Sequence, residues 1–382
     1  MSMTVALLER LIAFPTISRD SNLELIAFVQ DFLQARGFEV HRVTDASGQK
    51  AGLFARLGPA DPPGIMLSAH SDVVPVAGQD WSGDAFVMRS KDARLYGRGA
   101  TDMKGFLAAM LALADRAQGV ALAEPLKFAL SWDEEVGCIG IPQVLPHLAS
   151  TIGKPRLCIV GEPTSMQIAL GHKGKVALRA LCHGRAGHSA QAPLHLNALH
   201  MATDFIAGLR GLQADLAETG ARDDDYDVGY ATLHVGRLSG GTALNIVPDR
   251  AEIEFEYRYL ASQPPAMIEQ AIRDLAAAVV APLRAAHPQA AIEVAVTNAY
   301  PGLGTAQGSE AATFMQALLP DAPLIKVAYG TEAGHFDASG IPTVVCGPGS
   351  MAQGHIADEY IEMAQLAACD AMLDGVLAAI RG

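Results

Sequence analysis

The sequence predicts an α/β protein of two domains, one inserted into the other. The chain has 382 residues, which is more than one typical hydrophobic core accommodates. Residues 1–173 alternate helical and strand patterns, and residues 297–382 return to the same alternation. Between them, residues 174–296 show the order strand, helix, strand, strand, helix, strand, which is typical of a ferredoxin-like α+β unit.

Individual elements are expected from hydrophobic periodicity and from the residues that end them. A helix over 23–36 stops before Gly37, because glycine readily adopts the left-handed conformation that follows a helix. A strongly apolar helix is expected over 103–117, and a last helix over 361–380. In the inserted segment we expect strands at 176–182, 232–238, 251–260 and 292–296, with helices at 197–212 and 267–286.

Composition excludes several classes of partner. Hydrophobic residues make up 50% of the chain and aromatic residues 6%, which is typical of a globular α/β protein. The formal net charge is −13 and Lys and Arg form no cluster, so we expect no nucleic-acid partner. No uncharged apolar run reaches the roughly 18 residues that cross a bilayer, so we expect no membrane partner.

The cysteines and the N-terminal segment predict a cytoplasmic location. The five cysteines form neither a CxxC pair nor an even set, so a disulfide framework is not expected: Cys138, Cys158, Cys182, Cys346 and Cys369. Glu9 and Arg10 interrupt the first apolar stretch, which therefore predicts an amphipathic helix rather than a signal peptide.

Three predicted apolar strands each stop at an acidic residue or a histidine. In open α/β sheets, ligand sites form in the loops that follow the strands, so this recurrence predicts one site. The strands and the residues at their ends are 64–70 with His70, 127–132 with Asp133, Glu134 and Glu135, and 157–160 with Glu162.

Two segments offer an imidazole or a carboxylate with more than one interpretation. In SAHSDVVP, a neutral His70 can bind a metal through one nitrogen while Asp72 orients the ring, although a structural histidine is the more common case. In YGRGATDMKG, Asp102 stands between a glycine-rich loop and a helix, where it can cap the helix or bridge two cations.

The remaining candidates complete a mixed set of nitrogen and oxygen donors. Glu134 and Glu135 are neighbours in an extended segment, so one carboxylate can face a metal and the other the substrate. Glu162 in GEPT and His355 in GPGSMAQGHIADEY each lie in a loop shaped by glycine and proline. Such a donor set suits zinc, cobalt or manganese better than calcium or copper.

Taken in this order, these segments resemble those of the dinuclear metallo-aminoacylases and carboxypeptidases, a family that includes acetylornithine deacetylases and succinyl-diaminopimelate desuccinylases. The resemblance covers essentially the whole chain. It implies a mixed-sheet, metallopeptidase-like catalytic domain formed by residues 1–173 and 297–382, and an inserted lid and dimerisation domain formed by residues 174–296. It also implies a homodimer and two divalent metal ions, zinc or else cobalt.

The resemblance assigns a role to each candidate in the catalytic domain. The implied ligands are His70 and Glu162 for one metal ion, Glu135 and His355 for the other, and Asp102 between the two. Asp72 would orient His70, and Glu134 would act as the general base that takes a proton from the attacking water.

In the inserted domain, the resemblance implies contacts with substrate. GRAGHSAQAP resembles the segment that delivers a histidine, here His188, to the site of the partner subunit. GGTALNIVPDRAEIEFEYRYL implies that Asn245 and Arg258 contact the substrate carboxylate. Without the resemblance, His188 would be an ordinary exposed histidine and Arg258 part of a charged strand face.

The segment YGTEAGHFDASGIPTVVCGPGSMAQGHIADEY is most similar to the acetylornithine-cleaving branch, which implies hydrolysis of Nα-acetyl-L-ornithine to L-ornithine and acetate, a step of arginine biosynthesis. Glu332 would then be a partner for the cationic side chain. After His355 this chain has Ile356-Ala357, where family members often have proline or another residue. The substrate stays open, because members of the family share every catalytic residue and differ at a few pocket positions. The alternatives are a desuccinylase, a general aminoacylase or dipeptidase, an inactive binding homologue, which the presence of Glu134 disfavours, and a cysteine hydrolase using Cys346.

Overall fold

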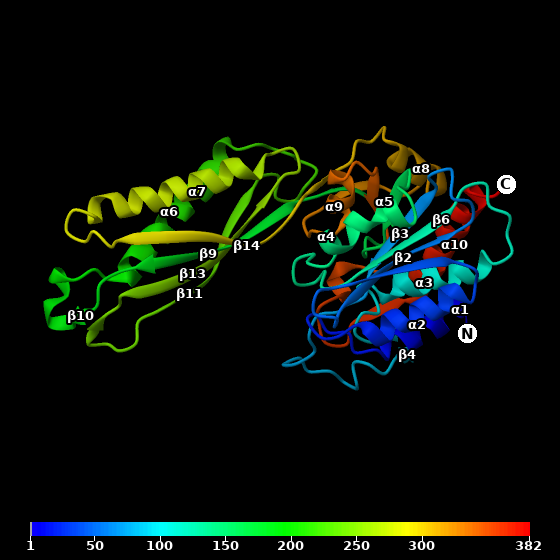
Figure 1. Cartoon of the computed structure of the whole chain (residues 1–382), viewed down its shortest axis with the longest axis horizontal. Coiled ribbons are helices and arrows are strands. Elements are labelled where there is room, and N and C mark those ends of the chain that lie inside the picture. The colour runs from blue at the N-terminus through cyan, green and yellow to red at the C-terminus, as the bar shows by residue number, and fades with distance from the viewer. Residues whose placement is uncertain (1) are drawn as a thin grey trace. The chain divides into compact units, whose positions relative to one another are not determined.

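A computed structural model describes residues 2–382 of the chain (Figure 1). The chain forms two compact units. Unit 1 contains the chain up to Gly171 together with Leu303–Val327 and Thr331–Gly382, and unit 2 contains His172–Gly302 and Ala328–Gly330.

Unit 1 is built on a mixed sheet with the order β1-β2-β6-β3-β7-β17-β8-β15, and β16 pairs with β8. Strand β3 runs parallel to β6 and β7, whereas β1, β2 and β6 pair antiparallel. The carboxyl ends of β6, β3 and β7 therefore meet at one edge of the sheet. The strands are β1 (Glu39–Thr44), β2 (Ala51–Leu57), β3 (Ile65–His70), β6 (Leu126–Ser131), β7 (Leu157–Val160), β8 (Ile168–His172), β15 (Leu303–Gly304), β16 (Leu324–Val327) and β17 (Thr343–Val345).

Helices cover both faces of this sheet (Figure 1). On one face, α3 (Lys104–Arg116) packs between α1 (Met3–Ile12) and α10 (Met363–Ala379), with α2 (Leu23–Gln34) beside them. The other face carries α4 (Ile141–Val144), α5 (Leu148–Thr151) and α9 (Ala333–Ala338). Helix α8 (Glu310–Leu318) packs against α10, and its buried residues share the core of α3 and α10. Every residue of α3 from Lys104 to Ala114 is buried, as its apolar sequence predicts.

A short second sheet joins two distant parts of unit 1. Its strands are β4 (Arg89–Lys91), β5 (Arg94–Tyr96) and β18 (Tyr360–Glu362), in the order β18-β5-β4. Strand β18 occupies the start of the segment for which the sequence predicts a helix at 361–380, so α10 begins only at Met363.

Unit 2 has the strand and helix order expected of a ferredoxin-like unit. Strands β11, β13, β9 and β14 form an antiparallel sheet in that order, and α6 and α7 pack against it. The elements are β9 (Gly174–His183), α6 (Ala198–Thr219), β11 (Thr232–Gly240), β13 (Arg250–Tyr259), α7 (Pro265–Val280) and β14 (Ala291–Tyr300). The predicted fold class, a mixed-sheet α/β domain with an inserted α+β domain, is confirmed.

Two helices of unit 2 differ from their predicted lengths. Helix α6 continues past Leu212 to Thr219, because Leu212 and Leu216 still pack against the core of unit 2. Helix α7 ends at Val280 rather than at 286, because Pro282 cannot continue an α-helix and a short 3-10 turn follows.

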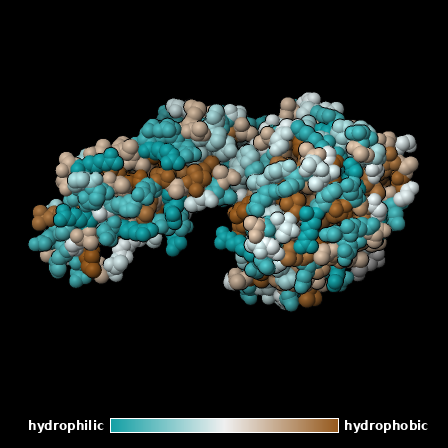
Figure 2. All heavy atoms as spheres, in the orientation of Figure 1, coloured by the Kyte–Doolittle hydropathy of each residue, from teal (hydrophilic) through white to brown (hydrophobic). Residues whose placement is uncertain are grey.

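The visible surface of each unit mixes hydrophilic and hydrophobic residues (Figure 2). In unit 2, a small ladder formed by β10 (Gly187–His188) and β12 (Ile246–Val247) has the exposed side chains of Leu194, Leu244 and Ile246 near it. Among residues 2–382, no helix combines the length and the apolar character that a membrane crossing requires.

Gly161 provides a test of the packing between β7 and α3. A Cβ atom at this position would lie 1.9 Å from Cδ1 of Phe106, which is fully buried. We therefore expect Gly161→Ala to lower the free energy of unfolding by about 1–3 kcal/mol through overpacking, as measured by urea denaturation. Gly211→Ala in α6 is the control, since a Cβ there meets no atom within 4 Å and should stabilise the helix by about 0.5–1 kcal/mol. Unchanged stability of Gly161→Ala would contradict this account of the packing.

Candidate active site

Two groups of side chains that could hold a metal ion lie together in unit 1 and share Asp102. The first contains His70, Asp102 and Glu162, and the second contains Asp102, Glu135 and His355. Within each group, the candidate ligand atoms lie within 4.8 Å of one another. Nε2 of His70 is 3.2 Å from Oδ1 of Asp102, and Nε2 of His355 is 3.1 Å from its Oδ2. Each oxygen of Asp102 therefore faces a different imidazole.

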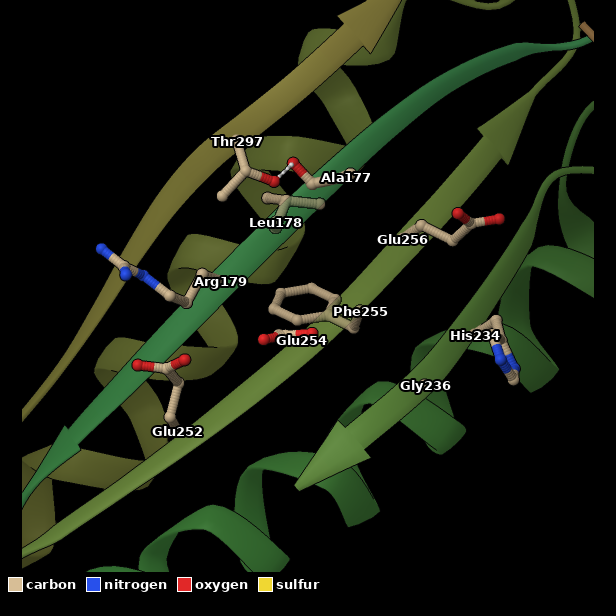
Figure 3. Close-up of a pocket in the computed structure, with 10 residues that line it drawn as sticks. All are labelled: Ala177, Leu178, Arg179, His234, Gly236, Glu252, Glu254, Phe255, Glu256 and Thr297. Carbon is tan, nitrogen blue, oxygen red and sulfur yellow. Dashed lines mark hydrogen bonds between the residues drawn. The ribbon is translucent and has the colours of Figure 1, made fainter. Parts of the chain in front are cut away.

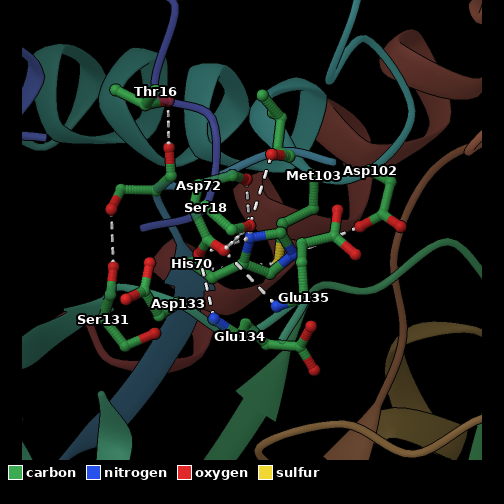
Figure 4. Close-up of polar contacts among 12 residues, drawn as sticks. Thr16, Ser18, His70, Asp72, Asp102, Met103, Ser131, Asp133, Glu134 and Glu135 are labelled. Atoms are coloured by element: carbon green, nitrogen blue, oxygen red, sulfur yellow. Dashed lines mark hydrogen bonds and ion pairs between the residues drawn. The ribbon is translucent and has the colours of Figure 1, made fainter. Parts of the chain in front are cut away.

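The sheet brings most of these residues to one edge. His70 is the last residue of β3, while Glu135 and Glu162 lie in the loops after β6 and β7, the two parallel neighbours of β3. Asp102 precedes α3, and His355 lies in the loop between β17 and β18. Figure 4 shows His70, Asp102, Glu134 and Glu135 converging at this edge.

Asp72 connects the loops that carry these residues. Its Oδ1 accepts a hydrogen bond from the backbone N–H of Glu134 at 3.0 Å, and its Oδ2 accepts one from the hydroxyl of Ser18 at 2.7 Å. Nδ1 of His70 lies 3.0 Å from the backbone oxygen of Asp72 and 3.5 Å from its Oδ1. Asp72 thus holds both the imidazole ring and the backbone of the adjacent glutamates (Figure 4).

The site holds more negative than positive charge. Burial and the neighbouring carboxylates raise the pKa of Glu134 to about 8 and that of Glu135 to about 7. They also raise the pKa of Glu162 well above its usual range. Burial disfavours a charged His70, but the nearby carboxylates of Glu162 and Asp102 outweigh this effect and raise its pKa. Carboxylates that destabilise one another in this way indicate a site that cations would neutralise.

The donor set fits two divalent cations. Each group combines one imidazole with two carboxylates, a mixture of nitrogen and oxygen donors that suits zinc or cobalt. Oε1 of Glu135 is inaccessible to solvent and has no hydrogen-bond partner among the described residues, so it is available to a ligand.

Glu134 belongs to neither group, although it adjoins Glu135 in the chain. Its Oε1 accepts a hydrogen bond from the thiol of Cys138 at 3.4 Å. The two adjacent glutamates therefore differ in their surroundings. The expected extended segment is a turn in the structure, because the backbone oxygen of Glu134 accepts hydrogen bonds from Gly137 and Cys138 at 2.8 and 2.7 Å.

Glu332 lies in the same cluster of carboxylates. It immediately precedes α9, only 2% of its surface is exposed, and its Oε1 has no partner among the described side chains. Burial and the charge of Glu134 raise the pKa of Glu332 to about 8. A bound cationic group would stabilise the ionised carboxylate of Glu332, which burial and Glu134 disfavour.

The other three predicted residues lie in unit 2. His188 and Asn245 are exposed and adjoin the β10–β12 ladder, in which His188 pairs with Ile246. Arg258 lies on β13, and its Nε donates a hydrogen bond to Glu256 at 3.1 Å. In the β9–β13 register, Arg258 faces Lys175, at the end of the sheet where β9 begins.

A hollow of about 440 Å³ in unit 2 contains none of the predicted site residues (Figure 3). Two of its carboxylates already have cationic partners, because Glu254 pairs with Arg237 and Glu256 pairs with Lys175. Side chains that line it include Arg179, His234, Glu252, Glu254, Glu256 and Thr297.

Cys346 is unsuited to nucleophilic catalysis. Its side chain is fully buried and contacts the sulfur of Met372. Burial raises the pKa of Cys346 to about 12, so it stays a thiol near neutral pH. The geometry therefore disfavours a cysteine hydrolase.

Sequence reasoning missed a buried ion pair beside Asp102. Nη1 of Arg98 donates to Oε2 of Glu359 at 2.7 Å, and both side chains are 1% exposed. Oε1 of Glu359 accepts hydrogen bonds from the backbone N–H groups of Thr101 and Asp102, at 2.9 and 3.1 Å. The only signal in the sequence was that Arg98 lies in the glycine-rich segment of Asp102, and Glu359 in the glycine-rich segment of His355.

Comparison with known proteins shows that most of the chain matches one protein family. Residues 66–379 match the family described as Peptidase family M20/M25/M40. An acetylornithine deacetylase of Myxococcus xanthus is 32% identical over 373 residues, which cover 96% of this chain and 95% of that protein.

Two solved structures show the same fold. A metallo-carboxypeptidase of family M20 from Sulfolobus solfataricus has a TM-score of 0.80 and 18% identity, and the similarity covers 99% of both chains. A dinuclear metal-binding peptidase of family M20 from Bacillus subtilis has a TM-score of 0.67 and 14% identity, and the similarity covers 99% of this chain and 97% of that one.

Proposed function

The chain belongs to peptidase family M20/M25/M40, and on this premise we propose that it hydrolyses the amide bond of an N-acyl amino acid. The proposed substrate is Nα-acetyl-L-ornithine, which is cleaved to L-ornithine and acetate. The observation that carries this proposal is the pair of ligand groups that share Asp102, with Glu134 beside them. The similarity to the Myxococcus deacetylase supports the choice of substrate, because it extends over nearly all of both chains.

Two divalent metal ions, zinc or else cobalt, are proposed as cofactors. His70, Asp102 and Glu162 would hold one ion, and Asp102, Glu135 and His355 the other. When bound, such ions polarise a carbonyl group and lower the pKa of water.

Glu134 is the proposed general base. Its carboxylate lies among the ligands without belonging to either group, so it can take a proton from the attacking water. The same carboxyl group then gives the proton to the departing α-amine. Asp72 positions Glu134 for both transfers by holding its backbone N–H.

Glu332, Asn245 and Arg258 are the proposed contacts with substrate. The buried carboxylate of Glu332 has an oxygen without a partner and would pair with the side-chain ammonium group of ornithine. Asn245 and Arg258 would contact the substrate carboxylate, and Arg258 would then share its guanidinium between this group and Glu256.

A cytoplasmic homodimer is the proposed assembly, with the inserted domain as lid and dimerisation domain. Leu194, Leu244 and Ile246 are exposed near His188 and Asn245, and exposed apolar side chains favour a protein contact. In this arrangement His188 would stabilise the oxyanion in the site of the partner subunit.

A panel of N-acyl amino acids, assayed with metal-free and metal-loaded protein, tests the proposed function. We expect turnover only after addition of Zn²⁺ or Co²⁺, with the highest kcat/KM for Nα-acetyl-L-ornithine. Full turnover by protein shown to be metal-free would refute the metal-dependent reaction. A higher kcat/KM for succinyl-diaminopimelate or for dipeptides would change the substrate but not the reaction class.

Substitution of the two adjacent glutamates should separate a base from a ligand. We expect Glu134→Gln to keep two metal ions and lose about 10²–10⁴ in kcat, because the proton acceptor is removed. Glu135→Gln should instead lose affinity for one ion. Elemental analysis of both variants alongside their kinetics provides the measurement, and equal loss of metal would show that the two roles are assigned wrongly.

The role of His188 can be tested by mixing subunits. Removing one oxyanion donor typically costs about 10²–10³ in kcat, so we expect His188→Ala to fall in this range with its metal content unchanged. A mixture of His188→Ala and Glu134→Ala subunits should regain activity, because one site of each heterodimer would contain an intact base and an intact histidine. If subunits exchange and activity stays at the level of the separate variants, His188 does not act across the dimer.

A further inference from the structure

A closed ring of hydrogen bonds joins the loop of Asp102 to the loop of His355. Starting at Asp102, its backbone N–H donates to Glu359, and Glu359 accepts from Arg98. Nη2 of Arg98 donates to the side-chain oxygen of Gln79. Nε2 of Gln79 then donates to the backbone oxygen of His355 at 2.9 Å. The ring closes where Nε2 of His355 meets Oδ2 of Asp102, at 3.1 Å.

The orientation of the Gln79 amide follows from its neighbours. Its oxygen accepts from Arg98 and from Nε1 of Trp81, which lies 3.1 Å away. Both of these groups are donors only, so the amide oxygen must face them. The NH₂ group is thereby directed to the carbonyl oxygen of His355.

His355 is the proposed ligand that most needs such support. Its side chain is 44% exposed, whereas those of His70, Asp102, Glu135 and Glu162 are at most 4% exposed. Its backbone also has a left-handed φ of 59°. Packing therefore constrains His355 less than the other ligands.

We propose that Gln79 is a positioning residue for the metal site formed by Asp102, Glu135 and His355. Its amide fixes the backbone of His355, and Arg98 and Glu359 extend this constraint to the backbone of Asp102. The other metal site does not depend on the contact between Gln79 and His355, because it lacks His355 and its ligands His70 and Glu162 are set by the ends of β3 and β7. This inference rests on the proposed function, since it assumes that two divalent ions bind.

Titration of metal-free protein with Co²⁺, followed by visible absorption and calorimetry, tests the inference. The decisive variant is Gln79→Glu, because a carboxylate still accepts from Arg98 and Trp81 but cannot donate to His355. Supporting partners of metal ligands typically contribute 10–100-fold in affinity, so we expect one of the two Co²⁺ affinities to weaken by about 10–100-fold. The other affinity should match wild type, and kcat should fall more than KM rises.

Three comparisons make the result interpretable. Gln79→Ala should weaken the same ion, and Gln270→Ala is the matched control, since its amide donates to exposed Asp274 in unit 2 and should change neither affinity. Glu359→Gln should weaken both ions, because Glu359 holds the backbone of Asp102, which belongs to both ligand groups.

Wild-type affinity for both ions in Gln79→Glu would overturn the inference and leave the proposed function intact. Equal weakening of both ions in Gln79→Glu would also overturn the inference, because the substitution would then disturb the whole site rather than the position of His355. Failure of the wild-type protein to bind two Co²⁺ ions would overturn the inference together with the proposed function.

Discussion

The buried carboxylate of Asp102 is the constraint around which the site is organised. Only 3% of it is exposed, and a buried charge is tolerated only when it is paired. Burial opposes its ionisation, but hydrogen bonds with the imidazoles of His355 and His70 outweigh burial and hold the pKa of Asp102 well below its usual range. Both imidazoles contact this one carboxylate. The carboxyl end of β3, which carries His70, and the loop before β18, which carries His355, must therefore both lie next to Asp102.

The strand-end residues were predictable because local sequence patterns are sufficient to locate buried strands and their ends. Apolar runs that end at His70, Glu135 and Glu162 indicate buried strands, and parallel strands bring their carboxyl ends to one edge. The order β6-β3-β7 itself cannot be read from such runs, since hydrophobic periodicity carries no information on which strands pair. Asp102 and His355 do not end a predicted strand, and the resemblance to a known family was needed to choose the bridging role of Asp102 and to assign His355 to one metal ion.

The supporting residues could not be predicted, because their partners are distant in sequence. Gln79 and His355 are 276 positions apart, and Asp102 and Glu359 are 257 apart. Lys50 likewise forms a buried ion pair with Asp133, at 2.6 Å, across 83 positions. A charged or amide side chain in a glycine-rich loop has many possible partners, and only the folded chain selects one. The start of α10 and the end of α6 differed from prediction for the same reason, since β18 and the contacts of Leu216 depend on tertiary packing, whereas the end of α7 follows from Pro282.

Asp72 makes the geometry of the proposed ligands and that of the proposed base depend on each other. Its carboxylate contacts the ring of His70 and the backbone N–H groups of Glu134 and Glu135, at 3.5, 3.0 and 3.4 Å. A shift of this one group would therefore move a ligand of each metal group and the base together. Because the adjacent glutamates share this anchor, the position of the base is tied to that of the Glu135 ligand. Two roles that need different surroundings can thus be held by neighbouring residues of one short loop.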